Sequence, residues 1–338
     1  MNDHPGLPSH VPLVVATRGG FVESVHYGSI AVVDARGALL AGVGDAAFPV
    51  FTRSTLKPFQ ALPFVSDGGP ARFGFSAEQV ALMCASHSGE PRQVVAVADM
   101  LARAGCDERK LGCGMHPPLF FGATHTPVPP DLAPTPLHHN CSGKHAGFLA
   151  WCRLHAEPLD GYLDPVHPLQ RAIRRSLAAL LECDEGELVA GTDGCSAPNY
   201  AMPLARLAGG YARLVSEGRR GAGPLGVIFR AMTEHPDMVS GESRGDLLFA
   251  QAGRGDWLAK AGAEGVQAIG VASRGIGIAV KIADGGARAV RVATLSALAQ
   301  LGLLPPDAAA LLRAWGDDEI RNYAGIVTGR LVPVFTLD

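Results

Sequence analysis

Residues 52–57 read Thr-Arg-Ser-Thr-Leu-Lys, which places Ser54 three positions before Lys57. The segment predicts the start of a helix, where positions i and i+3 share one face. A serine hydroxyl becomes a nucleophile at neutral pH when a base takes its proton, and lysine can be that base. The same pattern also fits an ordinary helix start with a serine cap and a solvated lysine. The rest of the chain has to decide between these interpretations.

The composition is that of a globular protein. Of the 338 residues, 47% are apolar and 18% are charged, which is ample for a packed core. A net charge of -3 shows no excess of basic residues of the kind that binds nucleic acid or acidic membranes. No apolar run reaches the roughly 20 residues of a membrane helix, and the first ten residues lack the pattern of a signal peptide. We therefore expect a cytoplasmic protein without nucleic-acid or membrane partners. Its odd number of seven cysteines speaks against a disulfide framework.

Strand patterns at both ends of the chain enclose a mainly helical middle. The expected strands cover 13–15, 21–26, 29–34, 264–271, 275–282 and 287–292, with a hairpin turn at 284–286. This order predicts an α/β (α+β) fold in which N- and C-terminal strands form one antiparallel sheet beside a central helical region. We expect a single domain over 1–338, with a sheet portion at 12–50 and 264–335 and a helical and loop portion at 54–260.

Two further motifs resemble the first in chemistry. Residues 84–90 (CASHSGE) fall where a helix beginning with the capping box at Ser76 should end. Ser86 and its neighbours can face a cleft there, or they can simply satisfy carbonyls at the helix end. Lys260 and Gly262 come just before an expected strand, where a ligand could lie against bare backbone. A surface turn is the alternative.

In order along the chain, Ser-x-x-Lys, Ser-x-Ser and Lys-x-Gly parallel the S-x-x-K, S-D-N and K-T-G signatures of serine acyl transferases. Class A β-lactamases and penicillin-binding proteins carry those signatures. Here Ser88 replaces the asparagine and Ala261 the threonine. The order of the motifs indicates a shared type of catalysis rather than a shared substrate.

Residues 138–145 (HHNCSGKH) and 192–198 (TDGCSAP) could bring thiols and histidines to a zinc ion. Neither has the Cys-x-x-Cys spacing of a structural zinc site. Asn140 and Asp193 could equally be turn formers, and Cys141 a buried thiol. A third polar stretch, 238–246 (MVSGESRGD), could hold the charged ends of an amino acid or form a surface salt-bridge cluster.

Six segments together resemble the L-asparaginase II family, typified by the inducible, thermolabile rhizobial enzyme. They are 53–60 (RSTLKPFQ), 84–90 (CASHSGE), 139–145 (HNCSGKH), 191–198 (GTDGCSAP), 238–242 (MVSGE) and 260–265 (KAGAEG). The resemblance spans about residues 12 to 335. It implies a fold similar to serine β-lactamases and glutaminases, and hydrolysis of L-asparagine to L-aspartate and ammonia.

The resemblance also implies roles for individual residues. Ser54 would be the nucleophile with Lys57 as its base, and Ser86 with Lys260 would relay protons. The metal ligands implied for Zn²⁺ are Cys141, Lys144 and Cys195. The implied substrate-binding residues are Arg53, His87, Asn140, Asp193, Gly241 and Glu242. The family further implies a homodimer.

Two rival functions stay open. In the first, zinc held by Cys141 and Cys195 activates water, and the protein is a zinc-dependent amidohydrolase. In the second, the chain is a catalytically silent amino-acid binding protein. Within the serine mechanism itself, the sequence leaves open whether Ser54 or Ser86 is acylated, and whether asparagine or glutamine is preferred.

Overall fold

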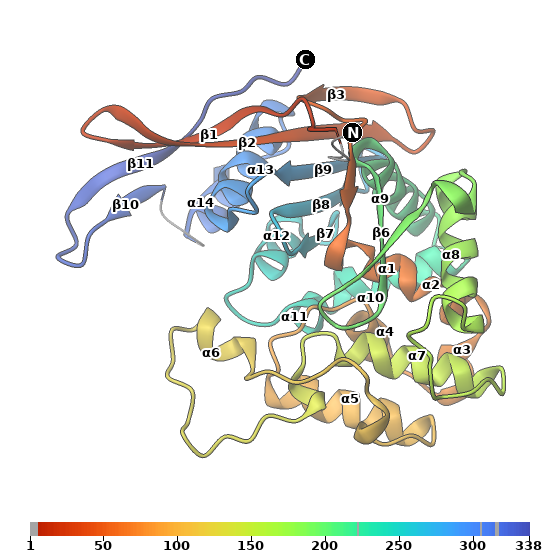
Figure 1. The fold of residues 1–338 in the computed structure, drawn as a ribbon. Helices are drawn as coiled ribbons and strands as arrows, with labels where there is room; N and C mark the ends of the chain where they lie inside the picture. The colour runs from red at the N-terminus through yellow and green to blue at the C-terminus, as the bar shows by residue number, and fades with distance from the viewer. Residues whose placement is uncertain (1–5, 222, 305, 315–317) are drawn as a thin grey trace, which may run out of the picture.

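The computed structural model describes residues 6–221, 223–304, 306–314 and 318–338. Its main feature is an eight-stranded antiparallel sheet formed by both ends of the described chain (Figure 1). The strand order is β10-β11-β1-β2-β9-β8-β7, and β3 pairs with β2. The strands are β1 (Val11–Arg18), β2 (Phe21–Asp34), β3 (Leu39–Val43), β7 (Trp257–Gly262), β8 (Val266–Val271), β9 (Ile276–Ile282), β10 (Glu319–Arg321) and β11 (Val327–Pro333). The prediction of one sheet from N- and C-terminal strands is confirmed.

The sheet is covered by helices on both faces along its central strand. In β2, Ala31 and Val33 belong to the core that includes helix α9 (Leu204–Arg219), while Ile30 and Val32 belong to a second core. The second core includes helix α13 (Ala287–Gln300). Successive side chains of a strand point to opposite faces, so an apolar run such as this one fits a strand buried on both sides.

The middle of the chain forms the helical part that lies below the sheet in Figure 1. The helices are α1 (Lys57–Gln60), α2 (Leu62–Ser66), α3 (Gly69–Phe73), α4 (Ala77–Met83), α5 (Pro91–Arg103), α6 (Leu119–Ala123), α7 (Ser142–Leu154), α8 (Pro168–Leu181), α10 (Gly223–Glu234), α11 (Pro236–Val239) and α12 (Gly245–Gly253). Helix α14 (Pro306–Ala314) follows α13 and belongs to the second core. The predicted capping box at Ser76 is present at the start of α4. No helix in the described ranges has the length and apolar character needed to cross a membrane.

A second, three-stranded sheet positions two loops of the candidate site. It consists of β4 (Pro49–Phe51), β5 (Val189–Thr192) and β6 (Pro198–Pro203), in the order β4-β6-β5. The segment after β4 carries Ser54, and the β5–β6 turn carries Asp193 and Cys195. Pairing of β4 with β6 therefore brings residues some 140 positions apart in the sequence to one place.

Two predictions about the sheet are wrong. The predicted strand at 287–292 is the start of α13, because Ala289, Val292 and Ala293 bury at helical spacing against the sheet. The sheet portion also begins at Trp257 in β7 rather than at residue 264. The first four residues of β7 are all buried, so they show none of the alternation that marks a half-exposed strand.

Candidate active site

Ser54 lies in a 3-10 helix, η1 (Arg53–Leu56), and Lys57 begins α1 directly after it. The predicted helix start is thus confirmed, with a tighter first turn. Arg53 has a φ of 50°, a left-handed conformation that is rare for residues other than glycine. Asn199 clamps it by accepting from the Arg53 N–H and donating to its carbonyl oxygen, both at 2.9 Å. Backbone strain held in this way concentrates at functional sites, and here it orients the residue next to Ser54.

Lys57 is buried, with 1% of its surface exposed. Its Nζ lies 2.5 Å from the carbonyl oxygen of Ala85, 3.0 Å from Ser86 Oγ and 3.4 Å from the carbonyl oxygen of Asn140. Within the described ranges, the half-buried Ser54 makes no side-chain hydrogen bond. The structure thus brings Lys57 to Ser86, the serine that the resemblance pairs with Lys260.

Lys260 lies on β7 and is fully buried. Its Nζ donates to Asp246 Oδ2 at 3.0 Å and to the carbonyl oxygen of Ala261 at 2.8 Å. No hydrogen bond joins it to Ser86 in the part of the chain that is described. Burial lowers the pKa of Lys260 to about 8, against the opposing effect of the Asp246 carboxylate. Asp246 is a site residue that sequence reasoning missed, although it closes the polar stretch 238–246.

Arg53 and Asp193, both predicted to bind substrate, form an ion pair with Nε and Oδ1 at 2.8 Å. Glu264 lies 4.0 Å from the Arg53 guanidinium on its other side. The ion pair ties the η1 segment to the β5–β6 turn. The Arg53 side chain keeps 25% of its surface exposed, so its guanidinium can still reach a ligand.

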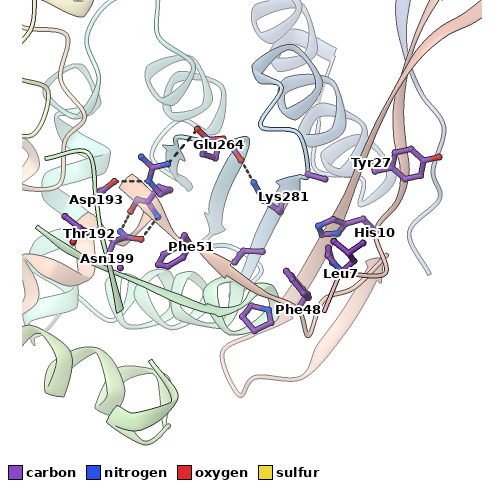
Figure 2. Close-up of a pocket in the computed structure, with 16 residues that line it drawn as sticks. Leu7, His10, Tyr27, Phe48, Phe51, Thr192, Asp193, Asn199, Glu264 and Lys281 are labelled. Carbon is purple, nitrogen blue, oxygen red and sulfur yellow. Dashed lines mark hydrogen bonds and ion pairs between the residues drawn. The ribbon is translucent and has the colours of Figure 1, made fainter. Parts of the chain in front are cut away.

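A cavity of about 800 Å³ adjoins this ion pair. Thr192 and Asp193 lie at one end of it, and Leu7 and Tyr27 at the other (Figure 2). Arg53 also lines it, whereas the four predicted serine and lysine residues do not. This cavity is therefore a neighbour of the serine and lysine centre, with Arg53 between the two.

His87 lies deeper than the arginine, whereas Asn140 is half-buried like Arg53. His87 is fully buried, with Nε2 2.8 Å from Ser142 Oγ and Nδ1 accepting from the Gly89 N–H. Burial lowers the pKa of His87 to about 3, so the ring is neutral. Asn140 turns its carbonyl oxygen toward Lys57 and its Oδ1 toward the Cys141 thiol. Both residues thus connect neighbouring parts of the site.

Gly241 and Glu242 pass close to the loop that carries Ser86. The Glu242 N–H donates to the buried carboxylate of Glu90 at 2.8 Å, while the Glu242 side chain is exposed. Gly241 has a φ of 102°, and a Cβ there would lie 2.3 Å from Glu90 Oε1. Only glycine therefore fits at position 241 without displacing the Glu90 side chain. Glu90 is a second residue that the sequence reasoning quoted in a motif but did not assign to the site.

The three predicted metal ligands gather in one buried cluster. Lys144 Nζ lies 3.0 Å from Cys195 Sγ, and the Cys141 thiol, which is also buried, donates to Asn140 Oδ1 at 3.5 Å. The neighbouring Cys141 thiol and the Lys144 ammonium lower the pKa of Cys195 far below its usual range, whereas Cys195 raises the pKa of Cys141. Burial opposes the charge of Lys144, yet the Cys195 thiolate raises the pKa of Lys144. The cluster therefore holds a thiolate against an ammonium group.

The donor set of this cluster fits a zinc ion in its chemistry. Thiolates are preferred zinc ligands, and a dication could replace the proton that Lys144 and the two thiols share. Among the described residues, no three His, Cys, Asp or Glu side chains lie close enough to hold a metal. A zinc ion here would therefore need Lys144 as a ligand beside the two thiols.

Comparison with known proteins gives one family and several structural neighbours. The profile described as L-asparaginase II matches residues 14–333. No curated protein matches the chain. Among solved structures, a β-lactamase from Mycobacterium bovis is 14% identical, covers 85% of this chain and 94% of its own, and superposes with a TM-score of 0.33.

Proposed function

The chain belongs to the L-asparaginase II family of amidohydrolases, and from this premise we propose that it hydrolyses L-asparagine to L-aspartate and ammonia. The observation that carries the proposal is the buried amine of Lys57, 3.0 Å from the Ser86 hydroxyl and three residues after Ser54. A lysine amine that contacts one serine and follows another by three residues is a candidate base–nucleophile arrangement for acyl transfer.

Ser54 is the proposed nucleophile. Its side chain is half-buried and makes no hydrogen bond within the described ranges, so a substrate can reach it. Ser86 is 4% exposed, and its hydroxyl already contacts Lys57. Catalytic hydrogen bonds are often long or misaligned before substrate binds, so the lack of a hydrogen bond between Ser54 and Lys57 among the described residues is compatible with this role.

The proposed reaction proceeds through an aspartyl ester. Ser54 Oγ attacks the side-chain amide carbon while its proton passes to Lys57, and backbone N–H groups near Ser54 stabilise the oxyanion. Lys57 returns the proton, through the Ser86 hydroxyl, to the amide nitrogen, and ammonia leaves. Water then attacks the ester with Lys57 again as base, which releases aspartate and restores Ser54.

The charged ends of the substrate have partners nearby. Arg53 would bind the α-carboxylate, because a guanidinium matches a carboxylate in two parallel hydrogen bonds. Asp193 and the exposed Glu242 are the proposed acceptors for the α-ammonium group. Asn140 and Gly241 would line the site with backbone, and His87 would hold the loop behind Ser86 from its buried position.

Zinc, if bound, would be held by Cys141, Lys144 and Cys195, and its chemistry would be that of a Lewis acid in a thiolate-rich setting. The residues themselves connect the loop before α7 to the β5–β6 turn. That connection fixes Asp193, and through Asp193 it fixes Arg53. We also propose that the protein works as a homodimer in the cytoplasm, which light scattering and cell fractionation would test.

A coupled ammonia assay with asparagine, glutamine and a β-lactam tests the proposed activity. We expect ammonia from asparagine. Binding of asparagine without ammonia release would favour the silent binding protein. Loss of all activity on chelation, restored by Zn²⁺, would favour the zinc-dependent amidohydrolase.

A further inference from the structure

Asp246 is fixed against β7 by both of its carboxylate oxygens. Oδ2 accepts from Lys260 Nζ at 3.0 Å, and Oδ1 accepts from the backbone N–H of Ala261 at 2.7 Å. The residue lies in the first turn of α12 and is 4% exposed. A carboxylate at this end of a helix is also favoured by the helix dipole. Asp246 therefore has little freedom to leave Lys260.

This arrangement determines what Lys260 can do. An isolated ammonium group is very costly to bury, and an opposite charge in good geometry reduces that cost. Lys260 donates hydrogen bonds to Asp246 and to the Ala261 carbonyl oxygen. In the described ranges it makes no hydrogen bond to Ser86. The amine that contacts Ser86 belongs to Lys57.

We propose that Asp246 is the positioning residue that holds Lys260 as a fixed ammonium cation, so that Lys260 supplies positive charge to the site and is not the base of Ser86. The inference rests on the proposed function, because it assigns different roles to the two lysines in that reaction. A charge fixed before substrate arrives needs no reorganisation when negative charge develops on the substrate.

The charged and titratable groups facing Lys260 come from several elements. Lys57 on α1 and Arg244 before α12 disfavour its charge, whereas Asp246 favours it. Burial raises the pKa of Cys84, after α4, to about 12, and it raises the pKa of Tyr211 on α9 well above its usual value. Both of those groups are neutral, so among the described groups near Lys260 the counter-charge comes from Asp246.

The test is Asp246→Asn. Asparagine keeps the size of the side chain and an oxygen acceptor for the Ala261 N–H, but removes the negative charge. We expect kcat for asparagine to fall on the order of 100-fold, and the alkaline limb of the kcat/KM profile to move down by about one pH unit or more. Asp246→Glu should restore part of both effects. Asp256→Asn is the matched control. The Asp256 carboxylate accepts from the N–H and the hydroxyl of Ser273 at the other end of β7, so this variant should leave the pH profile unchanged.

A measurement without turnover separates this inference from the proposed function. In protein labelled with ¹⁵N-lysine, the Lys260 signal, assigned with Lys260→Met, should titrate near pH 8 in the wild type. In Asp246→Asn it should titrate at least about one unit lower. A Lys260 amine that is already neutral below pH 7 in the wild type would overturn the inference, even if the variant does not fold. An Asp246→Asn enzyme with lower stability but an unmoved pH profile would overturn it as well.

Discussion

Two lysine-centred clusters meet at Asn140, and they differ in what surrounds the amine. In the hydroxyl centre (Ser54, Lys57, Ser86 and Lys260), Lys57 contacts two carbonyl oxygens and a hydroxyl. In the thiol centre (Cys141, Lys144 and Cys195), Lys144 contacts a thiolate. Neutral partners leave an amine free to exchange a proton with a hydroxyl, whereas a thiolate keeps the ammonium proton in place. The comparison agrees with the roles proposed above, in which the hydroxyl centre transfers protons and the thiol centre pairs charges or binds a metal.

The largest expected effect is that of Ser54→Ala. Removing the nucleophile should reduce turnover by on the order of 10³-fold or more. The melting temperature should hardly change, since no side-chain hydrogen bond of Ser54 within the described ranges is lost. Coupled ammonia release and thermal unfolding measure the two quantities. Substantial remaining activity would show that the nucleophile is a residue other than Ser54.

Lys57→Met should come next. Methionine retains most of the volume without the amine, so turnover should fall roughly 10²- to 10⁴-fold. The fold should also lose about 1–3 kcal/mol, because the buried carbonyl oxygen of Ala85 loses this donor. Lys110→Met is the matched control, because Lys110 pairs with Asp160 at the surface and should change neither quantity. Equal effects of both variants on turnover would contradict the role of Lys57.

Much of this comparison could be predicted from the sequence, because each motif keeps its catalytic residue types close together in the chain. Lys57 and Ser86 do come into contact, and so do Lys144 and Cys195. The terminal strands could likewise be predicted from their apolar runs and turn signals. The partner of each lysine could not be predicted, since it depends on how β7, α1 and α12 pack. Asp246 and Lys260 are 14 residues apart on different elements, and no spacing rule connects them.

The start of α13 shows a different limit of sequence reasoning. Residues 287–292 (ARAVRV) alternate small or branched apolar residues with arginine after a Gly-Gly turn, which is typical of a strand. In the structure, Ala289, Val292 and Ala293 are buried, so the buried face follows the i, i+3, i+4 spacing of a helix. Tertiary packing therefore decided the type of this element, and the local pattern alone misled.

Cys195→Ser should have a smaller effect than either change in the hydroxyl centre. It removes the thiolate that holds Lys144, so activity should fall about 10-fold, and mainly through KM, as the Arg53 and Asp193 anchor loosens. The zinc content of the purified protein, measured by elemental analysis, should fall together with the activity. Cys183→Ser, at a thiol outside this cluster, is the control. A loss as large as that of Ser54→Ala would instead favour the zinc-dependent reaction.

The smallest expected effect concerns stability and pH. The pKa of Lys260 is about 8 in the folded protein and near 10.5 in an ordinary setting, so the unfolded chain binds more protons between these values. Stability contributed by Lys260 should therefore rise with pH from about 8 to about 10.5, while activity falls as the cation is lost. The difference in unfolding free energy between wild type and Lys260→Met, followed over this range, isolates the contribution. A difference that does not change with pH would contradict the lowered pKa.

The most direct test of the hydroxyl centre is to find the acylated residue. The enzyme would be quenched in acid during turnover of asparagine, since acid preserves esters, and digested for peptide mapping by mass spectrometry. We predict an aspartyl ester on the peptide that contains Ser54, and none in Ser54→Ala. An ester on Ser86, or full turnover with no covalent adduct, would contradict the account.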